Sequence, residues 1–293
     1  MFSYRHGFHA GNHGDVLKHL ILCHLIDHFN QKENPYWLVD MHAGAGIYDL
    51  SGQWAQKKME YAQGIEAVWH AAIHEKNLPT SVARYLDVIR LFNPEGSLRF
   101  YPGSPWIALK MIRTQDRMKL FELHPSEADI IRQNLSAWRL HQPRQVTVLA
   151  EDAFAGIKKL LPPPTRRAIV LADPSYEDKL DYRRVVESVK DALKRFPTGC
   201  YAVWYPLVQR REAIDLARQL QKAASGREWI HVALSTQHPS SDGIGLHGSG
   251  VVVINPPWQL FDQLKSAMPW LVKVMGQDDR AGFKLERSDD AGK

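Results

Sequence analysis

The sequence predicts an α/β fold built on a mostly parallel sheet, and three observations support this fold class. Residues 168–172 (Ala-Ile-Val-Leu-Ala) form an unbroken apolar run, as in strands that helices cover on both faces. Other short apolar runs alternate with segments of helical periodicity. Carboxylates stand at or just beyond the ends of four successive candidate strands, at Asp40, Glu122, Asp152 and Asp173. Because ligands of open α/β sheets lie off the carboxyl ends of strands, these acids predict a ligand crevice.

The composition is that of a globular protein. Hydrophobic residues make up 44% of the 293 residues and charged residues 24%, and the formal net charge of +5 suits a polyanionic partner. Two cysteines cannot form a disulfide framework, and no paired Cys/His spacing indicates a zinc site. No apolar run approaches the ~18 residues of a membrane span. We therefore expect a cytoplasmic monomer that binds no metal and no membrane.

The N-terminal segment has the composition of a functional flap. Residues 3–19 contain four histidines and three glycines ahead of a helical pattern that begins near Val16, and Asp15 is expected to cap that helix. The segment is too polar and too rich in glycine to be core. Its histidines could be read as metal ligands, but no carboxylate or thiolate completes a recognisable set, so hydrogen-bonding histidines are favoured.

Residues 36–40 form the first predicted strand, and a glycine-rich turn follows it. Gly44 and Gly46 would let the backbone approach a ligand, although a plain tight turn explains them equally well. The third glycine of the dinucleotide fingerprint is absent, because Asp49 stands in its place. A strand that ends in Asp before Gly-x-Gly suits the nucleoside-methionine pocket of a methyltransferase better than a pyrophosphate loop.

Helical patterns at 64–73 and 82–92, with no strand between them, predict an insertion over residues 51–97. We expect residues 1–50 to hold the flap, a helix and the first strand, residues 98–276 to hold the rest of the sheet domain, and residues 277–293 to be a charged, loosely ordered tail. The remaining predicted strands are 117–122, 146–149, 201–205, 229–234 and 251–254, and the remaining predicted helices are 106–112, 181–195 and 211–224.

Residues 173–176 (Asp-Pro-Ser-Tyr) end the apolar run with a small chemical motif. Pro174 fixes its own φ and disfavours a helical conformation at Asp173, so the carboxylate and the Tyr176 ring are held in a defined relation. Acceptors beside an aromatic face suit a flipped base with an exocyclic amine. The motif resembles the (Asp/Asn/Ser)-Pro-Pro-(aromatic) signature of amino-group methyltransferases, with Ser175 in the third place; an ordinary strand-ending turn is the alternative.

A second stretch, residues 255–258 (Asn-Pro-Pro-Trp), matches the same signature formally better. We reject it as the catalytic motif because it follows the last predicted strand and is far from the series of acids. Asp173, by contrast, lies on the strand directly after Asp152.

Nearly the whole chain resembles the bacterial 23S ribosomal RNA adenine-N6 methyltransferase family, whose members have also been labelled as competence proteins for the use of external DNA. The matching segments are 3–6 (Ser-Tyr-Arg-His), 10–13 (Ala-Gly-Asn-His), 15–19 (Asp-Val-Leu-Lys-His), 42–46 (His-Ala-Gly-Ala-Gly), 101–105 (Tyr-Pro-Gly-Ser-Pro), 122–125 (Glu-Leu-His-Pro), 204–206 (Trp-Tyr-Pro) and 254–258 (Ile-Asn-Pro-Pro-Trp). The resemblance implies a Rossmann-like, S-adenosylmethionine-dependent methyltransferase sheet with a small helical insertion, and 23S ribosomal RNA as the partner.

The resemblance also implies roles for individual residues. Contacts to S-adenosylmethionine are implied for His19, His42, Ser104, Glu122, Asp152 and Ala153, where the most similar family members have glycine at position 153. An essential carboxylate is implied at Asp173. The residues implied to border the target base are Tyr4, His6 and Lys18.

The expected reaction is direct methyl transfer to the N6 amine of an adenine. That amine is a poor nucleophile, so Asp173 and the Pro174 carbonyl are expected to accept its hydrogens while Tyr176 stacks on the base. Adenine in DNA is an alternative substrate, and a non-catalytic nucleic-acid-binding protein with the same fold is an alternative of another class. A nicotinamide dehydrogenase is disfavoured, because the third glycine and a well-spaced ribose acid are missing.

Overall fold

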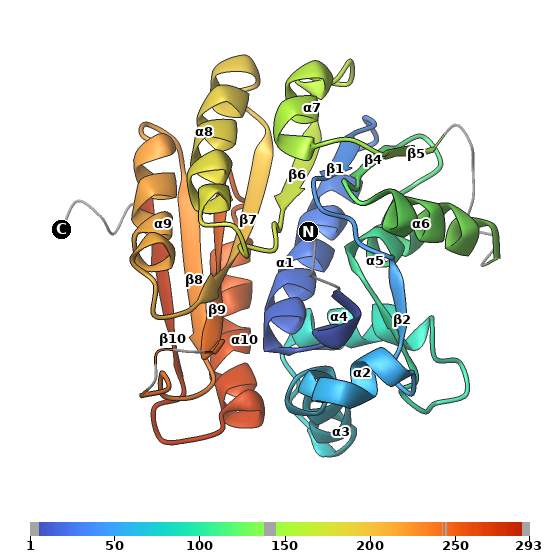
Figure 1. Ribbon diagram of the computed structural model, residues 1–293, viewed down its shortest axis with the longest axis vertical. Coiled ribbons are helices and arrows are strands. Elements are labelled where there is room, and N and C mark those ends of the chain that lie inside the picture. Colours follow the sequence, from blue (N-terminus) through green and yellow to red (C-terminus); the bar gives the residue numbers. More distant parts are fainter. Residues whose placement is uncertain (1–5, 138–144, 242, 244, 289–293) are drawn as a thin grey trace.

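The computed structural model describes residues 6–137, 145–241, 243 and 245–288. Within these residues the fold is an eight-stranded sheet with helices on both faces (Figure 1). In spatial order the strands are β10 (Gly282–Arg287), β8 (Trp229–Ser235), β9 (Gly248–Ile254), β7 (Cys200–Leu207), β6 (Ala168–Ala172), β1 (Trp37–Asp40), β4 (Arg117–Phe121) and β5 (Val146–Leu149). The strands from β7 to β5 are parallel, whereas β9 is antiparallel to β7 and β8, and β10 to β8. The predicted α/β, Rossmann-like class is confirmed.

The sheet has its topological switch point between β1 and β6. These strands pair side by side, with Asp40 opposite Leu171. The chain continues from β1 to β4 on one side and from β6 to β7 on the other. Because the connections leave the two strands in opposite directions, a crevice opens at their carboxyl ends, and this is the usual ligand position in such folds.

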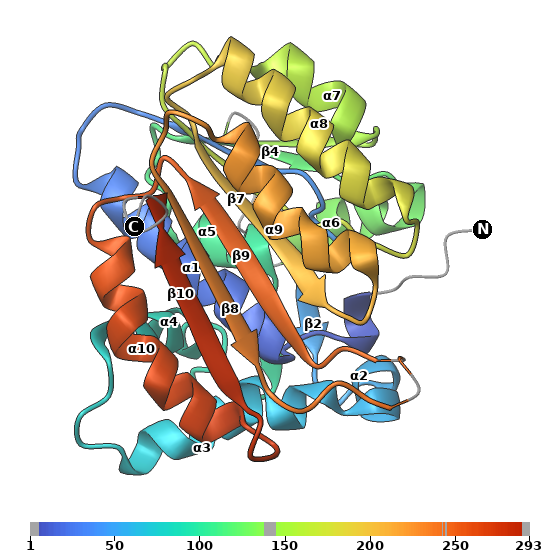
Figure 2. The same ribbon diagram turned by 90° about the vertical axis from the view of Figure 1, so that its left-hand side faces the viewer.

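Two layers of helices enclose the sheet, and Figure 2 shows α8 and α9 on the opposite side of it from α1 and α10. The helices that pack with the first face are α1 (His13–Asn30), α3 (Ile65–His74), α4 (Thr80–Arg90), α5 (Ser104–Met111), α6 (Pro125–Ala137) and α10 (Leu260–Met275). Those that pack with the second face are α7 (Ala153–Leu160), α8 (Leu180–Arg195) and α9 (Arg211–Ala223). Each face has its own cluster of buried apolar side chains, which explains why β6 is apolar at every position.

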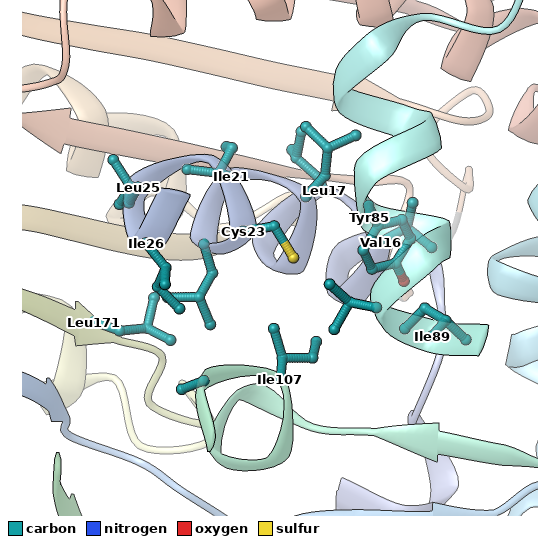
Figure 3. Close-up of a cluster of buried hydrophobic side chains, with 14 of the residues drawn as sticks. Val16, Leu17, Ile21, Cys23, Leu25, Ile26, Tyr85, Ile89, Ile107 and Leu171 are labelled. Atoms are coloured by element: carbon teal, nitrogen blue, oxygen red, sulfur yellow. The ribbon is translucent and has the colours of Figure 1, made fainter. Parts of the chain in front are cut away.

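Helix α1 is buried on nearly all sides, because it lies between the sheet and the helices α4 and α5. Figure 3 shows Ile21 and Leu25 of α1 in the same cluster as Leu171 of β6. Each such side chain contributes about 1.5–3 kcal/mol on full burial. The helix begins after Asn12, whose side chain accepts a hydrogen bond from the Asp15 amide, so the expectation that Asp15 is the cap is wrong. The Asp15 carboxylate instead accepts from the Gly11 amide at 2.9 Å.

The predicted helices between residues 51 and 97 are present. A small two-stranded antiparallel sheet, β2 (Ile47–Asp49) and β3 (Phe100–Pro102), flanks them, and they comprise α2 (Gln53–Lys58), the 3-10 turn η2 (Glu60–Gln63), α3 and α4. Tyr85 and Ile89 of α4 contribute to the same apolar cluster as α1, which Figure 3 also shows. The division of the chain into insertion and main domain stays a prediction.

The C-terminal residues differ from the predicted loose tail. Residues 282–287 form β10, an edge strand that pairs with β8, and α10 precedes it. Phe283 and Leu285 alternate with charged residues, and Leu285 packs against the core. Charged side chains are compatible with an edge strand, because its outer side faces water, and this is why a charged composition did not indicate a strand. Residues 289–293 lie outside the described residues.

Candidate active site

Two neighbouring cavities lie at the carboxyl ends of the parallel strands. The first, called here the His42 cavity, has a volume of about 530 Å³, and its walls include all the predicted cofactor residues, namely His19, His42, Ser104, Glu122, Asp152 and Ala153. The second, called here the Trp204 cavity, has a volume of about 350 Å³, and its walls include His9, Asn12, Tyr176, Tyr182 and Trp204. The residues that line both cavities are Lys18, Asp173, Ser175 and Glu177. Asp173 therefore stands between the two.

A hydrogen bond across the switch point fixes the backbone at Asp173. The Asp173 amide donates to Nδ1 of His42 at 3.2 Å, so this nitrogen carries no proton. Burial lowers the pKa of His42 to about 3, which keeps the ring neutral at physiological pH. The ring also contacts Phe154, with centroids 5.4 Å apart, and the Arg184 guanidinium lies 4.4 Å from the Phe154 ring.

Lys18 is a buried cation held between two carboxylates. Its Nζ lies 2.8 Å from Asp15 Oδ1 and also pairs with Asp173 Oδ2. Burial disfavours the charge, but the two carboxylates outweigh it and raise the pKa of Lys18 above its usual value. The pairing holds the 14%-exposed Asp173 side chain in one orientation, and Oδ1 has no donor among the described residues. That oxygen can accept hydrogen bonds from a ligand.

Asp40 has a structural position behind the site. It is fully buried and does not line either cavity. Its carboxylate accepts from Ser104 Oγ at 2.6 Å and from the His42 amide at 3.1 Å, and burial raises its pKa to about 6. Of the four strand-end acids, the three others reach the His42 cavity, whereas Asp40 shapes the turn after β1.

Glu122 closes the far side of the His42 cavity. Its carboxylate accepts from the Gly44 amide at 3.0 Å and from the His124 amide at 2.8 Å, and burial raises its pKa. Gly44 lines the cavity as expected, but Gly46 does not. Gly46 has φ of 88°, and a Cβ there would lie 2.0 Å from the Trp106 ring, so helix packing explains this glycine.

Asp152 caps helix α7, since its carboxylate accepts from the Phe154 amide at 2.9 Å, and Ala153 begins the helix. Its other oxygen pairs with Arg184, which comes from α8. Sequence analysis missed Arg184, Phe154 and Asp181. Asp181 and Arg184 could have been found from the sequence, because a predicted helix begins just after the Asp173 motif. The two residues are three positions apart in that helix and therefore share one face of it.

His19 is the last of the predicted cofactor residues. Its Nδ1 lies 2.7 Å from the Tyr101 hydroxyl, which lies 3.0 Å from that of Tyr85. This buried chain of polar groups orients the imidazole at the wall of the His42 cavity.

The predicted base-side residues are distributed unevenly. Tyr176 lines the Trp204 cavity but is only 2% exposed, and its hydroxyl donates to the Trp204 carbonyl at 2.7 Å. Trp204, which sequence analysis did not single out, is half-buried in the same wall, and the two ring centroids lie 6.2 Å apart. Pro174 lines the His42 cavity. Tyr4 lies outside the described residues, and of His6 only the backbone, in the turn η1 (His6–Phe8), is described.

The second Pro-aromatic motif lies near the amino ends of the parallel strands, away from the two cavities. Asn255 follows β9, whose end pairs with the beginning of β7. The Asn255 amide group donates to the carbonyls of Pro197 and Gly199 at 2.9 and 2.7 Å, and Trp258 is 77% exposed. Because β9 runs antiparallel to β7, this motif lies away from the two cavities, and its rejection as the catalytic motif stays a prediction.

The His42 cavity is strongly acidic. Its only described cations are Lys18 and Arg184, against the carboxylates of Glu122, Glu127, Asp152, Asp173, Glu177, Asp178 and Asp181. The described residues contain no group of three or more His, Cys, Asp or Glu side chains placed to hold a metal ion. In the same part of the chain, every helix is too short or too polar to cross a membrane. Carboxylates are negatively charged and accept hydrogen bonds, so this cavity favours an organic cation that carries hydrogen-bond donors.

The fold and this site define a Rossmann-like methyltransferase. A family model described as ribosomal RNA large subunit methyltransferase D, RlmJ, matches residues 33–287. The chain therefore belongs to the RlmJ family of ribosomal RNA large subunit methyltransferases, and the predicted family is confirmed.

Individual relatives agree with this family. Ribosomal RNA large subunit methyltransferase J of Escherichia coli (strain K12) is 41% identical over 92% of this chain and 93% of its own length. The protein of the same name from Haemophilus influenzae (strain Rd) is 41% identical over 98% of each chain. The crystal structure of protein LPL1258 from Legionella pneumophila has 32% identity and a TM-score of 0.83, over 95% of this chain and 98% of that one.

Proposed function

We propose that this protein transfers a methyl group from S-adenosylmethionine to the N6 amine of an adenine in 23S ribosomal RNA. The observation that carries the proposal is the place of Asp173 between two cavities, one acidic and one bordered by aromatic rings. A donor and an acceptor in these cavities would meet at this carboxylate. Holding two reactants in such a relation accounts for a large part of the rate in a transfer of this kind.

The residues of the His42 cavity fit S-adenosylmethionine. The cofactor carries a positively charged sulfonium and a positively charged ammonium group. The excess of carboxylates in the walls of the cavity suits both charges. Glu122 would accept from the ribose hydroxyls, and Asp152 would accept from the adenine amine beside the Ala153 amide. His42 and His19 would complete the wall of the cavity. Ser104 also lines it, and the hydrogen bond from its hydroxyl to Asp40 would hold it in place there. When bound, the cofactor supplies a methyl group activated by a sulfonium leaving group.

The Trp204 cavity would receive the target adenine, flipped out of its RNA structure. Asp173 Oδ1 and the Pro174 carbonyl would accept hydrogen bonds from the two N–H groups of the N6 amine, which keeps its lone pair directed at the methyl group. As the N–C bond forms and the S–C bond breaks, the nitrogen releases one proton along one of these hydrogen bonds. Lys18 holds the Asp173 carboxylate for this task through its other oxygen. The base would rest against the half-buried Trp204 ring, with the buried Tyr176 ring in the same wall. The roles of Tyr4 and His6 beside the base stay a prediction from the family resemblance.

Ribosomal RNA is preferred to DNA because both curated relatives are named as ribosomal RNA methyltransferases. The non-catalytic alternative is disfavoured, because Glu122, Asp152 and Asp173 all reach one cavity. A protein that only binds nucleic acid would not require the buried Lys18 to be paired with Asp173. The proposed substrate implies action in the cytoplasm.

Methyl transfer to RNA from a strain that lacks this protein tests the proposal. Purified protein is incubated with labelled S-adenosylmethionine and total RNA, and the nucleosides are separated. The expected product is labelled N6-methyladenosine in 23S RNA. Label in DNA under matched conditions, or a calorimetric titration without cofactor binding, would contradict the proposal in favour of the alternatives.

A further inference from the structure

An exposed aromatic and basic surface lies outside both cavities, on α2 and the turn η1. Trp54 of α2 is 46% exposed, and its ring meets that of Phe8 edge-on at 4.8 Å. Lys57 Nζ lies 5.7 Å from the Trp54 ring and 6.0 Å from the Phe8 ring, and Lys58 is exposed beside it. We call these four residues the Trp54 surface. Nothing in the proposed methyl transfer uses them.

The Trp54 surface is fastened to the rim of the Trp204 cavity. His9, which follows Phe8, lines that cavity, and its Nδ1 lies 2.9 Å from the Glu60 carboxylate. Glu60 stands two residues after Lys58 and also accepts from Asn12 Nδ2 at 3.0 Å, and Asn12 lines the same cavity. In Figures 1 and 2 α2 lies next to the N-terminal turn η1. Because His9 and Asn12 line the Trp204 cavity, we call these two segments together the ledge beside that cavity.

The charges of the ledge favour a polyanion. Helix α2 contains two lysines and no acidic residue. Within the described part of the chain, neither Lys57 nor Lys58 forms a salt bridge, whereas the neighbouring acid Glu60 is paired with His9. A partly exposed indole beside lysines suits the binding of unpaired nucleotides, because a base can stack on the ring while the cations meet the phosphates.

We propose that the Trp54 surface binds an unpaired nucleotide of the RNA that flanks the target adenine, with the base stacked on Trp54 and the adjoining phosphates at Lys57 and Lys58. This inference rests on the proposed function, because it assumes that the polymer enters the Trp204 cavity. A strand that places one base in that cavity continues over its rim. The ledge thereby selects a polynucleotide over an isolated nucleoside, without contact to the reacting atoms.

The test compares RNA binding and methyl transfer in three variants and their controls. Trp54→Ala should weaken binding of a 23S RNA transcript, and raise its KM, by roughly 5- to 150-fold, since one base stack on an aromatic ring is worth about 1–3 kcal/mol. Trp54→Phe should restore most of the affinity. The double variant Lys57→Gln, Lys58→Gln should reduce the slope of log affinity against log salt by roughly 1.4, at ~0.7 per phosphate contact with single strands. Affinity for S-adenosylmethionine and kcat at saturating RNA should not change.

Matched controls come from exposed residues that line neither cavity and are not part of the Trp54 surface. Trp258→Ala removes an indole that is 77% exposed, and the double variant Lys190→Gln, Lys194→Gln removes two exposed lysines of α8. Both should bind RNA as the wild type does. Equal losses in the control variants would overturn the inference, because a general loss of surface charge or aromatic area would then explain the result.

The outcomes separate this inference from the proposed function. If the wild type methylates 23S RNA and Trp54→Ala does so with unchanged KM and affinity, the inference alone is wrong. If the wild type transfers no methyl group but the Trp54 and lysine variants lose RNA affinity, the surface is confirmed and the proposed function is wrong. If Trp54→Ala instead dissociates a dimer seen by sedimentation and leaves RNA binding intact, the surface binds a second copy and the inference is overturned.

Discussion

The two Pro-aromatic motifs of this chain, residues 173–176 and 255–258, follow two interior strands of one sheet, β6 and β9, at opposite ends of the strands. Asp173 follows a strand that is parallel to its neighbours, so it meets the loops after β1, β4 and β5 around a common cavity. Asn255 follows β9, whose direction is opposite to that of β7 (Figure 2). Its side-chain amide donates to two carbonyls of the loop before β7. A motif of this kind gains its chemistry from the direction of the strand that carries it, even where its residues match the signature less well.

Exchanging the first residue of each motif should give the largest contrast. Asp173→Asn removes the negative acceptor and should lower kcat by roughly 10²- to 10⁴-fold, while the protein still binds S-adenosylmethionine in a calorimetric titration. Asn255→Ala should leave the kcat of the folded protein unchanged. It should destabilise by roughly 2 kcal/mol in urea unfolding, because two hydrogen bonds are lost and alanine is strained at the φ of 52°. The comparison fails if the Asn255 variant is the inactive one.

Lys18 should affect stability as strongly as activity. Lys18→Met leaves Asp15 and Asp173 as neighbouring carboxylates without their cation and should cost about 3–5 kcal/mol of unfolding free energy. The double variant Lys18→Met, Asp173→Asn should recover part of that loss, because the Asp15 carboxylate then no longer has a second negative charge beside it. A double-mutant cycle in urea measures the coupling. Additive effects of the two substitutions would show that the ion pair contributes no coupling energy.

The pH dependence of stability should report His42. Its pKa is about 3 in the folded protein because of burial, against 6.5 as the ordinary value, so between these limits only the unfolded state takes up the proton. The unfolding free energy should therefore fall as the pH decreases through this window, by roughly 2 kcal/mol between pH 7 and pH 5 for this residue alone. Subtracting the profile of His42→Asn isolates the contribution. Asn255→Ala, which lies away from the cavities, should keep the wild-type dependence of the unfolding free energy on pH.

The smallest contrast concerns the two aromatic rings. Tyr176→Phe removes the hydrogen bond from the buried hydroxyl to the Trp204 carbonyl and should destabilise by about 1 kcal/mol. Trp258→Phe, in a side chain that is 77% exposed, should stay within about 0.5 kcal/mol of the wild type. Thermal unfolding scans compare the pair, and equal shifts would show that Tyr176 is not fixed by its hydroxyl.

Much of the fold could be predicted from the sequence, because apolar runs identify buried parallel strands directly. Residues 168–172 form β6 without change, and the helices of 51–97 follow their periodicity. Strand direction could not be predicted, since the side-chain pattern of β9 is the same in either direction, and β10 was missed because its charged residues face water at the sheet edge.

The site could be predicted in part. The strand-end acids indicated one cavity, and three of them reach it, but a strand-end position does not reveal whether a carboxylate points into the cavity or behind it, as Asp40 does. Arg184 and Trp204 were missed, because their contribution depends on how α8 and β7 pack across the end of β6. Asp15 was predicted to cap α1, whereas its carboxylate pairs with Lys18. That pairing could not be predicted, because Lys18 also pairs with Asp173, which lies 155 positions further along the chain.

Helix α1 makes the N-terminal part of the chain unusually sensitive to shortening. Its middle turns fill the core on one face of the sheet, and its first turns hold Lys18 against Asp173 between the two cavities. A chain that starts at residue 12 would keep all of α1 but lose Phe8 and His9, and we expect it to fold with an incomplete wall of the Trp204 cavity. A chain that starts at residue 31 would lose the core helix itself, so deletion series and proteolytic fragments should show two successive thresholds, first for RNA capture and then for folding.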